Sequence, residues 1–119
     1  MTGIDLESRV REYLEAFDGR NLDKCLDLYA DDAVLNFQNS VYAGRQSITD
    51  WHRERFDADL RLVRLDNIFT NGETVTLEGV ATSNKLRAWK IKSVNGVMTV
   101  RFAGDKIQEL SFGVRFDLW

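Results

Sequence analysis

The sequence predicts an α+β domain in which helices come first and antiparallel strands follow. Up to residue 57, apolar residues recur at the spacing of helices that bury one face, whereas from Leu60 onward apolar and polar residues alternate as in half-buried strands. The chain has 119 residues, the size of one ordinary domain, and 44% of them are hydrophobic, which is enough for a core. We therefore expect a single domain over residues 1–119.

The first helix is predicted by apolar residues that share one helical face, namely Leu6, Val10, Tyr13, Leu14 and Phe17. Thr2 followed by Asp5 resembles a capping box at its start, and Gly19 marks its end. Asn21 is a good N-cap for a second helix with the inner face Leu22, Cys25, Leu26 and Tyr29. We expect Asp31-Asp32 to close this helix and residues 33–37 to form a short strand.

A third helix is predicted after Gly44, with Ser47 as its cap and Asp50 at the capping-box position. Its inner side carries Ile48, Trp51, His52 and Phe56.

Period-two alternation predicts strands over residues 60–69, 74–82 and 86–94, separated by turns at Asn71-Gly72 and at 83–85. Asn95-Gly96 fits either a hairpin turn or a bulge within one long strand, and we favour the bulge. Gly104-Asp105 predicts a hairpin into a final strand whose inner residues are Leu110, Phe112, Val114, Phe116 and Leu118.

Composition excludes several functions. The net charge of −3 comes without a Lys/Arg run, so we expect no nucleic-acid partner and no membrane partner. A single cysteine, Cys25, leaves no intrachain disulfide or cysteine-based metal site, and we expect no metal and no cofactor. The N-terminal residues MTGIDLESRV do not resemble a secretory signal, so we expect a cytoplasmic protein.

Residues 13–37, YLEAFDGRNLDKCLDLYADDAVLNF, together with Tyr42-Ala43-Gly44 and the strand-rich second half, resemble the nuclear transport factor 2-like superfamily. Within it, the chain looks most similar to the SnoaL-like and ketosteroid-isomerase-like small proteins. The resemblance implies a cone-shaped, curled antiparallel sheet closed by three N-terminal helices, a cystatin-like roll. It also implies a pocket between the first helix, the third helix and the inner face of the sheet.

The acid–base residues of the resembled enzymes are mostly missing. The first-helix tyrosine of ketosteroid isomerases matches Tyr13, but the base position matches Phe37 and the protonated aspartic acid matches Met98. Neither side chain can exchange a proton. The histidine and aspartate of SnoaL-type polyketide cyclases fall on Leu110 and Phe112, so that pair is absent too.

Tyr13 and His52 remain as the candidate catalytic pair. His52 matches a second tyrosine that supports the first-helix tyrosine in ketosteroid isomerases, so we expect a hydrogen bond between them. In the functional interpretation, the pair is a proton relay or orients a ligand. In the structural interpretation, His52 is a core histidine that satisfies the buried hydroxyl of Tyr13.

The apolar residues expected in the pocket are Phe17, Phe37, Trp51, Trp89, Met98, Phe102 and Phe112. They predict a small-molecule pocket for a mostly apolar ligand, with weak isomerase-like or cyclase-like activity as an option. One alternative is a non-catalytic dimerisation or interaction module whose cone is filled by its own side chains. Another is a true enzyme with an unrecognised polar set, formed by Tyr13, His52 and either a carboxylate or Arg55. We also expect a homodimer through the outer face of the sheet, where Val97, Thr99, Arg101, Gly113, Arg115, Asp117 and Trp119 fall.

Overall fold

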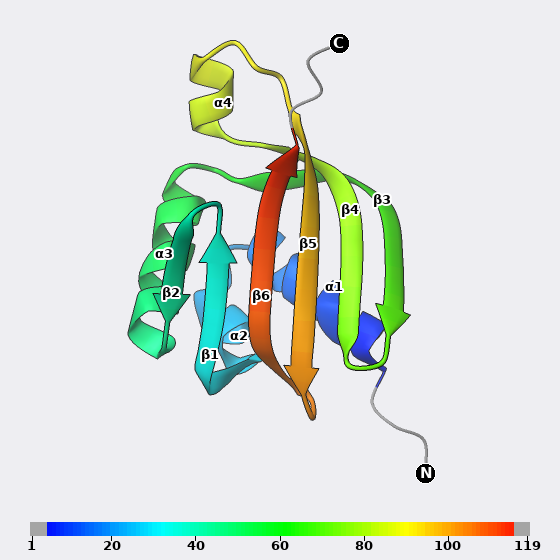
Figure 1. Ribbon diagram of the computed structural model, residues 1–119. Helices are drawn as coiled ribbons and strands as arrows, with labels where there is room; N and C mark the ends of the chain where they lie inside the picture. The colour runs from blue at the N-terminus through cyan, green and yellow to red at the C-terminus, as the bar shows by residue number, and fades with distance from the viewer. Residues whose placement is uncertain (1–4, 116–119) are drawn as a thin grey trace.

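The computed structural model describes residues 5–115 and contains four helices and six strands (Figure 1). The helices are α1 (Leu6–Asp18), α2 (Leu22–Asp27), α3 (Arg45–Asp57) and α4 (Asn84–Ala88). The strands are β1 (Tyr29–Phe37), β2 (Ser40–Ala43), β3 (Arg61–Asn71), β4 (Thr74–Thr82), β5 (Val94–Ala103) and β6 (Lys106–Arg115). The predicted α+β class is confirmed.

The six strands form one sheet in the order β2-β1-β6-β5-β4-β3. Strand β1 pairs with β6 in parallel, whereas the other neighbours are antiparallel, so the prediction of a fully antiparallel sheet is wrong. The two strands come from opposite ends of the chain, and local sequence patterns carry no information on their relative direction. The sheet is open, with β2 and β3 at its edges, and it is not strongly curled, so the expected cone shape is wrong (Figure 1).

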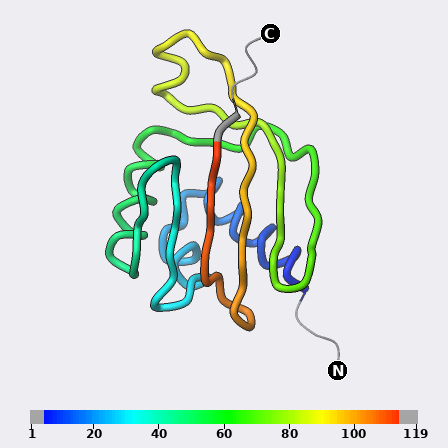
Figure 2. The backbone as a smooth tube through the Cα atoms, viewed as in Figure 1, coloured from blue at the N-terminus to red at the C-terminus, as the bar shows by residue number. Residues whose placement is uncertain are grey.

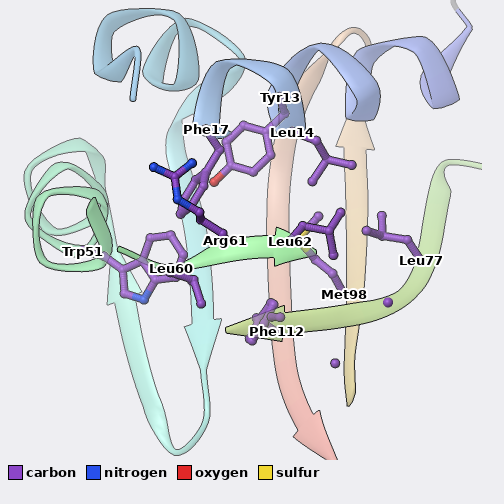
Figure 3. Close-up of a pocket in the computed structure, with 13 residues that line it drawn as sticks. Tyr13, Leu14, Phe17, Trp51, Leu60, Arg61, Leu62, Leu77, Met98 and Phe112 are labelled. Atoms are coloured by element: carbon purple, nitrogen blue, oxygen red, sulfur yellow. The ribbon is translucent and has the colours of Figure 1, made fainter. Parts of the chain in front are cut away.

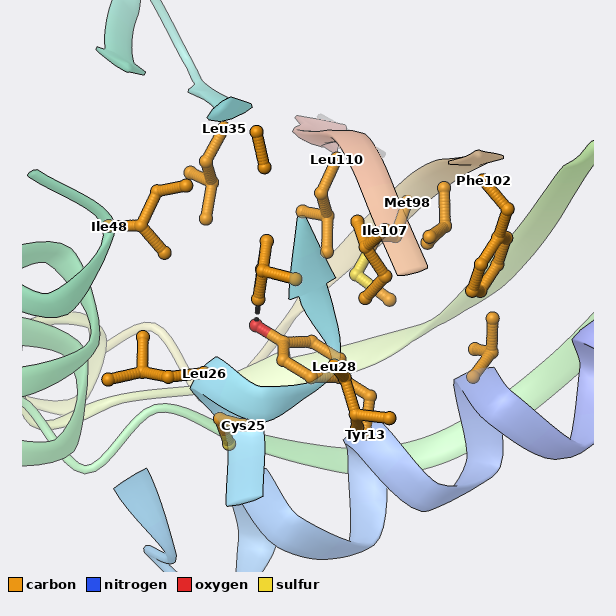
Figure 4. Packing of buried hydrophobic residues seen from close by; sticks show 14 of the residues in the cluster. Tyr13, Cys25, Leu26, Leu28, Leu35, Ile48, Met98, Phe102, Ile107 and Leu110 are labelled. Carbon is orange, nitrogen blue, oxygen red and sulfur yellow. Dashed lines mark hydrogen bonds between the residues drawn. The ribbon is translucent and has the colours of Figure 1, made fainter. Parts of the chain in front are cut away.

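Helices α1, α2 and α3 lie on one side of the sheet, and the backbone trace shows the blue segment of α1 and α2 running behind the strands (Figures 1 and 2). The core forms between these helices and the inner sheet face, where Tyr13 from α1 reaches the apolar side chains of β5 and β6 (Figure 4). Its fully buried members include Val10, Leu35, Ile48, Val100, Phe102, Ile107 and Leu110. The inward residues of β4 and β5, and Leu110 and Phe112 of β6, follow the predicted alternation, while the side chains of Val114, Phe116 and Leu118 lie outside the described ones.

Helix boundaries confirm part of the predicted capping. Asn21 caps α2 by accepting from the Lys24 amide, as expected. Asp5 itself caps α1 by accepting from the Ser8 amide, and the predicted cap Thr2 lies outside the described residues. Helix α3 begins three residues earlier than predicted, because Gly44 (φ 85°) occupies the N-cap and Ser47 lies inside the helix. Only glycine adopts this backbone conformation readily.

Three segments differ from the prediction. Tyr29 and Asp31-Asp32 belong to β1 and not to the second helix. Residues 40–43 form the edge strand β2, which was not predicted. The predicted strand 86–94 is instead the short helix α4 and a loop, because the Ser83 hydroxyl accepts from the Leu86 amide and starts a helix.

Asn95 and Gly96 are neither a hairpin nor a bulge. Both residues pair in regular register with Val80 and Gly79 of β4 on one side and with β6 on the other. Strand β5 therefore continues straight through the Asn-Gly pair, and the favoured bulge is wrong. The predicted hairpin at Gly104-Asp105 is present between β5 and β6.

Gly79 is required by a close approach between strands. A Cβ atom at this position would lie 2.5 Å from the carbonyl oxygen of Arg64 and 2.8 Å from Cδ1 of Leu62. We expect Gly79→Ala to lower the free energy of unfolding by roughly 1 kcal/mol or more, because backbone has to move. Urea denaturation measures the loss, and the matched variant Gly113→Ala, whose Cβ would meet no atom within 4 Å, serves as the control. Equal stability of the two variants would contradict the prediction.

Candidate functional site

Three buried side chains form a continuous hydrogen-bond chain between α1, α3 and β1. The Tyr29 hydroxyl donates to the Tyr13 hydroxyl at 2.9 Å, and the Tyr13 hydroxyl lies 2.7 Å from Nε2 of His52. Nδ1 of His52 lies 2.7 Å from the carbonyl oxygen of Ile48, one turn earlier in α3. The expected hydrogen bond between Tyr13 and His52 is thus present, and Tyr29 extends it.

The direction of each bond follows from the Ile48 carbonyl, which can only accept. Nδ1 of His52 must therefore carry a proton, and in the neutral ring Nε2 accepts the proton of the Tyr13 hydroxyl. The Tyr13 oxygen in turn accepts from Tyr29. Because a hydroxyl has a single hydrogen, Tyr13 in this state has none left for a ligand carbonyl.

Burial keeps the three side chains of this hydrogen-bond chain uncharged near neutral pH. Desolvation lowers the pKa of His52 to about 4, against the partial support of its bond to the Ile48 carbonyl. Desolvation likewise raises the pKa of Tyr13 well above its usual value, and it raises the pKa of Tyr29. The nearby Cys25 thiol is buried too, with its pKa raised to about 12, which makes it unreactive near neutral pH.

The interior of the fold holds only a small apolar cavity of about 60 Å³ beside Tyr13 (Figure 3). Its wall comes from α1, α3 and the inner sheet face: Tyr13, Leu14, Phe17, Trp51, Leu60, Arg61, Leu62, Leu77, Gly79, Ala81, Gly96, Met98 and Phe112. An engineered cavity that binds benzene measures about 150 Å³. The interior, as it stands, is therefore too full for a ring-sized ligand.

A larger cleft of about 210 Å³ opens where α3 and β1 end and α4 begins. The α4 segment projects beyond the end of the sheet here (Figure 2). The apolar lining is Phe37, Ala58, Leu60, Ala81, Leu86, Trp89, Val94 and Phe112, and the polar lining is Gln38, Arg55, Ser83 and Lys85. Leu60, Ala81 and Phe112 line both the cleft and the interior cavity, so these three side chains separate the two.

The structure divides the predicted pocket residues into four groups. Phe17, Trp51 and Met98 line the cavity, Phe37 and Trp89 line the cleft, and Phe112 lines both. Trp89 is 68% exposed at the rim, because residues 86–89 turn as a helix instead of a strand. Phe102 is 1% exposed and lies in the core, where it lines neither space.

The main group that sequence reasoning undervalued is Arg55. Its guanidinium carbon lies 4.9 Å from the ring centroid of Phe37 and 5.9 Å from that of Trp51. The spacing from Trp51, one turn along α3, was the available signal, but the ring of Phe37 comes from β1 and could not be placed from sequence. Lys85 was missed because residues 83–85 were predicted as a turn, whereas Lys85 lies in α4.

No group of three or more His, Cys, Asp or Glu side chains within the described part of the chain converges to hold a metal ion. Over the same part of the chain, no helix is long and apolar enough to cross a membrane.

The catalytic role expected of Tyr13 and His52 stays a prediction.

Solved structures with the same fold come from several bacteria. A nuclear transport factor 2-like protein of unknown function from Cytophaga hutchinsonii superposes with a TM-score of 0.79 at 15% identity, covering 96% of this chain and 93% of its own. A candidate polyketide cyclase from Sinorhizobium meliloti reaches 0.80 at 16% identity, covering 95% and 100%. A candidate ketosteroid isomerase from Kribbella flavida reaches 0.79 at 14% identity, covering 94% and 78%.

These identities establish the fold alone. No curated protein matches the chain. The family model of the SnoaL-like domain matches residues 10–110, which include most of α1, all of α2, α3 and α4, and most of the sheet. The chain therefore belongs to the SnoaL-like domain family and has the nuclear transport factor 2-like fold.

Proposed function

We propose that this protein binds a small, mostly apolar molecule in the cleft between α3, β1 and α4. The observation that carries the proposal is the cleft itself, which is about 210 Å³ in volume and is lined mainly by apolar and aromatic side chains with a few polar groups. Phe37, Trp89 and Phe112 offer ring faces from three separate elements. Such a lining is typical of small-molecule sites.

The cavity beside Tyr13 supports the proposal as a possible extension of the cleft. Phe112 is half-buried and stacks on Phe37, with ring centroids 5.5 Å apart. A ligand that displaced the Phe112 ring would join the cleft to the apolar space beyond it. The Tyr13 hydroxyl is committed to His52, so binding here rests on apolar contact and not on that hydroxyl.

The neutral fluorescent probe N-phenyl-1-naphthylamine tests the proposal. Its emission should rise on binding and should saturate with one site per chain. Ala81→Leu adds bulk to the wall shared by the two spaces and should weaken binding, while Ala103→Leu, at an exposed position at the opposite end of the sheet, should leave it unchanged. No saturable binding, or equal binding by both variants, would contradict the proposal.

We expect no steroid isomerase activity. Phe37 and Met98 occupy the positions of the two carboxyl groups, and neither can move a proton. A steady-state assay with a β,γ-unsaturated ketosteroid should show turnover at the solvent background. Turnover well above background that survives Tyr13→Phe would show that another group of this chain does the chemistry.

A second candidate function is a dimerisation module, favoured by the uncovered outer face of the sheet. The strand registers place one row of side chains straight across that face, in the order Val41, Asn36, Ser111, Thr99, Thr76 and Phe69. Val41 and Phe69, at the two ends of the row, are 67% and 52% exposed. Hydroxyl and amide groups between two apolar ends suit a self-complementary, mixed interface.

We therefore expect a homodimer through this face. Sedimentation equilibrium at micromolar concentration should give twice the chain mass, and Thr99→Arg should shift it to one chain mass by placing two like charges near the twofold axis. The contributions expected from Arg115, Asp117 and Trp119 concern side chains outside the described ones. A single-chain mass at every concentration would contradict the predicted dimer. The cytoplasmic location also stays a prediction.

A further inference from the structure

The cleft carries positive charge in an otherwise acidic protein. The whole chain has a net charge of −3, yet among the described residues Arg55 and Lys85 line the cleft and no carboxylate does. Asp59, the nearest acidic residue after α3, is bound by Arg20, Arg61 and Arg87. The local charge at the cleft therefore favours an anion.

Arg55 has donors to spare. Its side chain is only 16% exposed, and its one ion pair runs at 3.2 Å from Nη2 to Glu54, the preceding residue, which is itself 59% exposed. The Nε of Arg55 is buried and has no hydrogen-bond partner. A buried donor without an acceptor is costly, at about 1–3 kcal/mol, and therefore rare.

A second unpaired donor lies beside it. Nε1 of Trp51 is also buried without a partner, and Trp51 is only 2% exposed. Among the described residues, these two atoms are the buried side-chain nitrogens and oxygens that lack a partner. They are neighbours, since the Arg55 guanidinium lies over the Trp51 ring. Trp51 lines the interior cavity and Arg55 lines the cleft, so the unpaired donor that points to a ligand in the cleft is that of Arg55.

Arg20 provides the contrast. It is also partly buried and also lies over aromatic rings, those of Phe17 and Phe56. Its guanidinium, however, donates to the carbonyl oxygens of Phe17 and Leu60 and to the carboxylate of Asp59. The Arg20 guanidinium makes three structural hydrogen bonds, whereas the Arg55 guanidinium lies against two aromatic rings and its buried Nε makes no hydrogen bond.

We propose that the cleft binds a small carboxylic acid with an aromatic or aliphatic body, with the carboxylate on the Arg55 guanidinium and the body against Phe37, Phe112 and Trp89. The planar guanidinium matches a carboxylate by paired hydrogen bonds, and its contacts with the Phe37 and Trp51 rings help to fix its position. A cleft of about 210 Å³ exceeds the benzene-sized cavity of about 150 Å³, so the body is one or two rings in size. This inference rests on the proposed binding function and adds the chemical class of the ligand.

Isothermal titration calorimetry with 1-naphthoate and its neutral counterpart 1-naphthamide is the test. The acid should bind wild-type protein at least about tenfold more tightly than the amide, a comparison that needs no variant. Arg55→Gln should weaken naphthoate binding by about tenfold or more and leave naphthamide binding unchanged. Arg53→Gln removes the same charge from an exposed position of α3 outside the cleft and should change naphthoate affinity by less than about twofold.

Arg55→Lys keeps the charge but loses the paired donors, so its naphthoate affinity should fall between those of wild type and Arg55→Gln. Thermal melts confirm that each variant is folded. Equal affinity for acid and amide, or an Arg55→Gln variant that binds naphthoate normally, would overturn the inference while leaving the cleft as an apolar site. If neither the naphthyl compounds nor the neutral fluorescent probe binds, both the inference and the proposed function fail.

Discussion

Tyr13→Phe should lower the free energy of unfolding by about 3 kcal/mol, although it removes a single oxygen. Loss of that oxygen leaves two buried groups without a partner, the hydroxyl of Tyr29 and Nε2 of His52. Each such group costs about 1–3 kcal/mol in a buried site. The expected loss is a large part of the stability of an ordinary domain, about 5–15 kcal/mol.

Tyr29→Phe is the matched control, because it also removes one hydroxyl oxygen, in this case from the first donor of the hydrogen-bond chain. Tyr13 loses an incoming bond but still donates to His52, so no donor is left unpaired and the expected cost is about 1 kcal/mol. The double variant leaves only His52 unsatisfied and should cost less than the sum of the single variants. Urea denaturation of the four proteins measures these values. Equal losses from the two single variants would show that the hydrogen bonds do not run in the order described.

The helical half of this fold is largely predictable from sequence because its signals are local. Val10 and Tyr13 mark the inner face of α1 by spacing, and Asn21 starts α2 as its cap. The errors occur where two local signals compete. Ser83 followed by a polar residue fits a turn or a helix start, and the structure uses the helix. Asn95-Gly96 fits a turn, but pairing with β4 and β6 on both sides keeps it in a strand.

The parallel pairing of β1 with β6 could not be predicted from patterns within either strand. The register that puts Phe37 beside Phe112 also builds one wall of the cleft. The candidate site therefore depends on a contact between the two ends of the fold. This is why Phe37 and Phe112 were predicted as pocket residues from the resemblance, while Arg55 was named only as one option for a polar set and its position over Phe37 was not predicted.

The pair Tyr13 and His52 was predictable for the opposite reason. Each lies on the inner face of its own helix, and helix spacing gives that face directly. Tyr29 was assigned to the wrong element, so the third member of the hydrogen-bond chain was missed. With Tyr29 included, the hydroxyl of Tyr13, the hydroxyl of Tyr29 and both ring nitrogens of His52 each have a hydrogen-bond partner within the core.

The stability of the protein should fall by about 2 kcal/mol when the pH is lowered from 7 to 5, and His52 should be the cause. Burial lowers the pKa of His52 to about 4 in the folded protein, compared with 6.5 for an ordinary histidine. Between these values the unfolded chain takes up a proton that the folded protein excludes, so unfolding becomes easier as the pH falls through this window. Above pH 6.5 both states hold a neutral ring, and stability should level off.

His52 is the only histidine of the chain. The aromatic rings that contact its imidazole belong to Tyr13, Phe17, Tyr29, Trp51 and Phe56. None of these five side chains carries a carboxylate that would stabilise the protonated imidazole. Asp5 and Asp59 also have lowered pKa values, but their effect on stability falls near and below pH 4, because the ordinary aspartate pKa is 3.8. Urea denaturation at intervals from pH 7 to pH 5 measures the slope, and His52→Gln should abolish it whatever its own stability. A wild-type protein equally stable across this range would mean that His52 takes up its proton in the folded state, which a ring enclosed by five aromatic neighbours and bound to a tyrosine hydroxyl should resist.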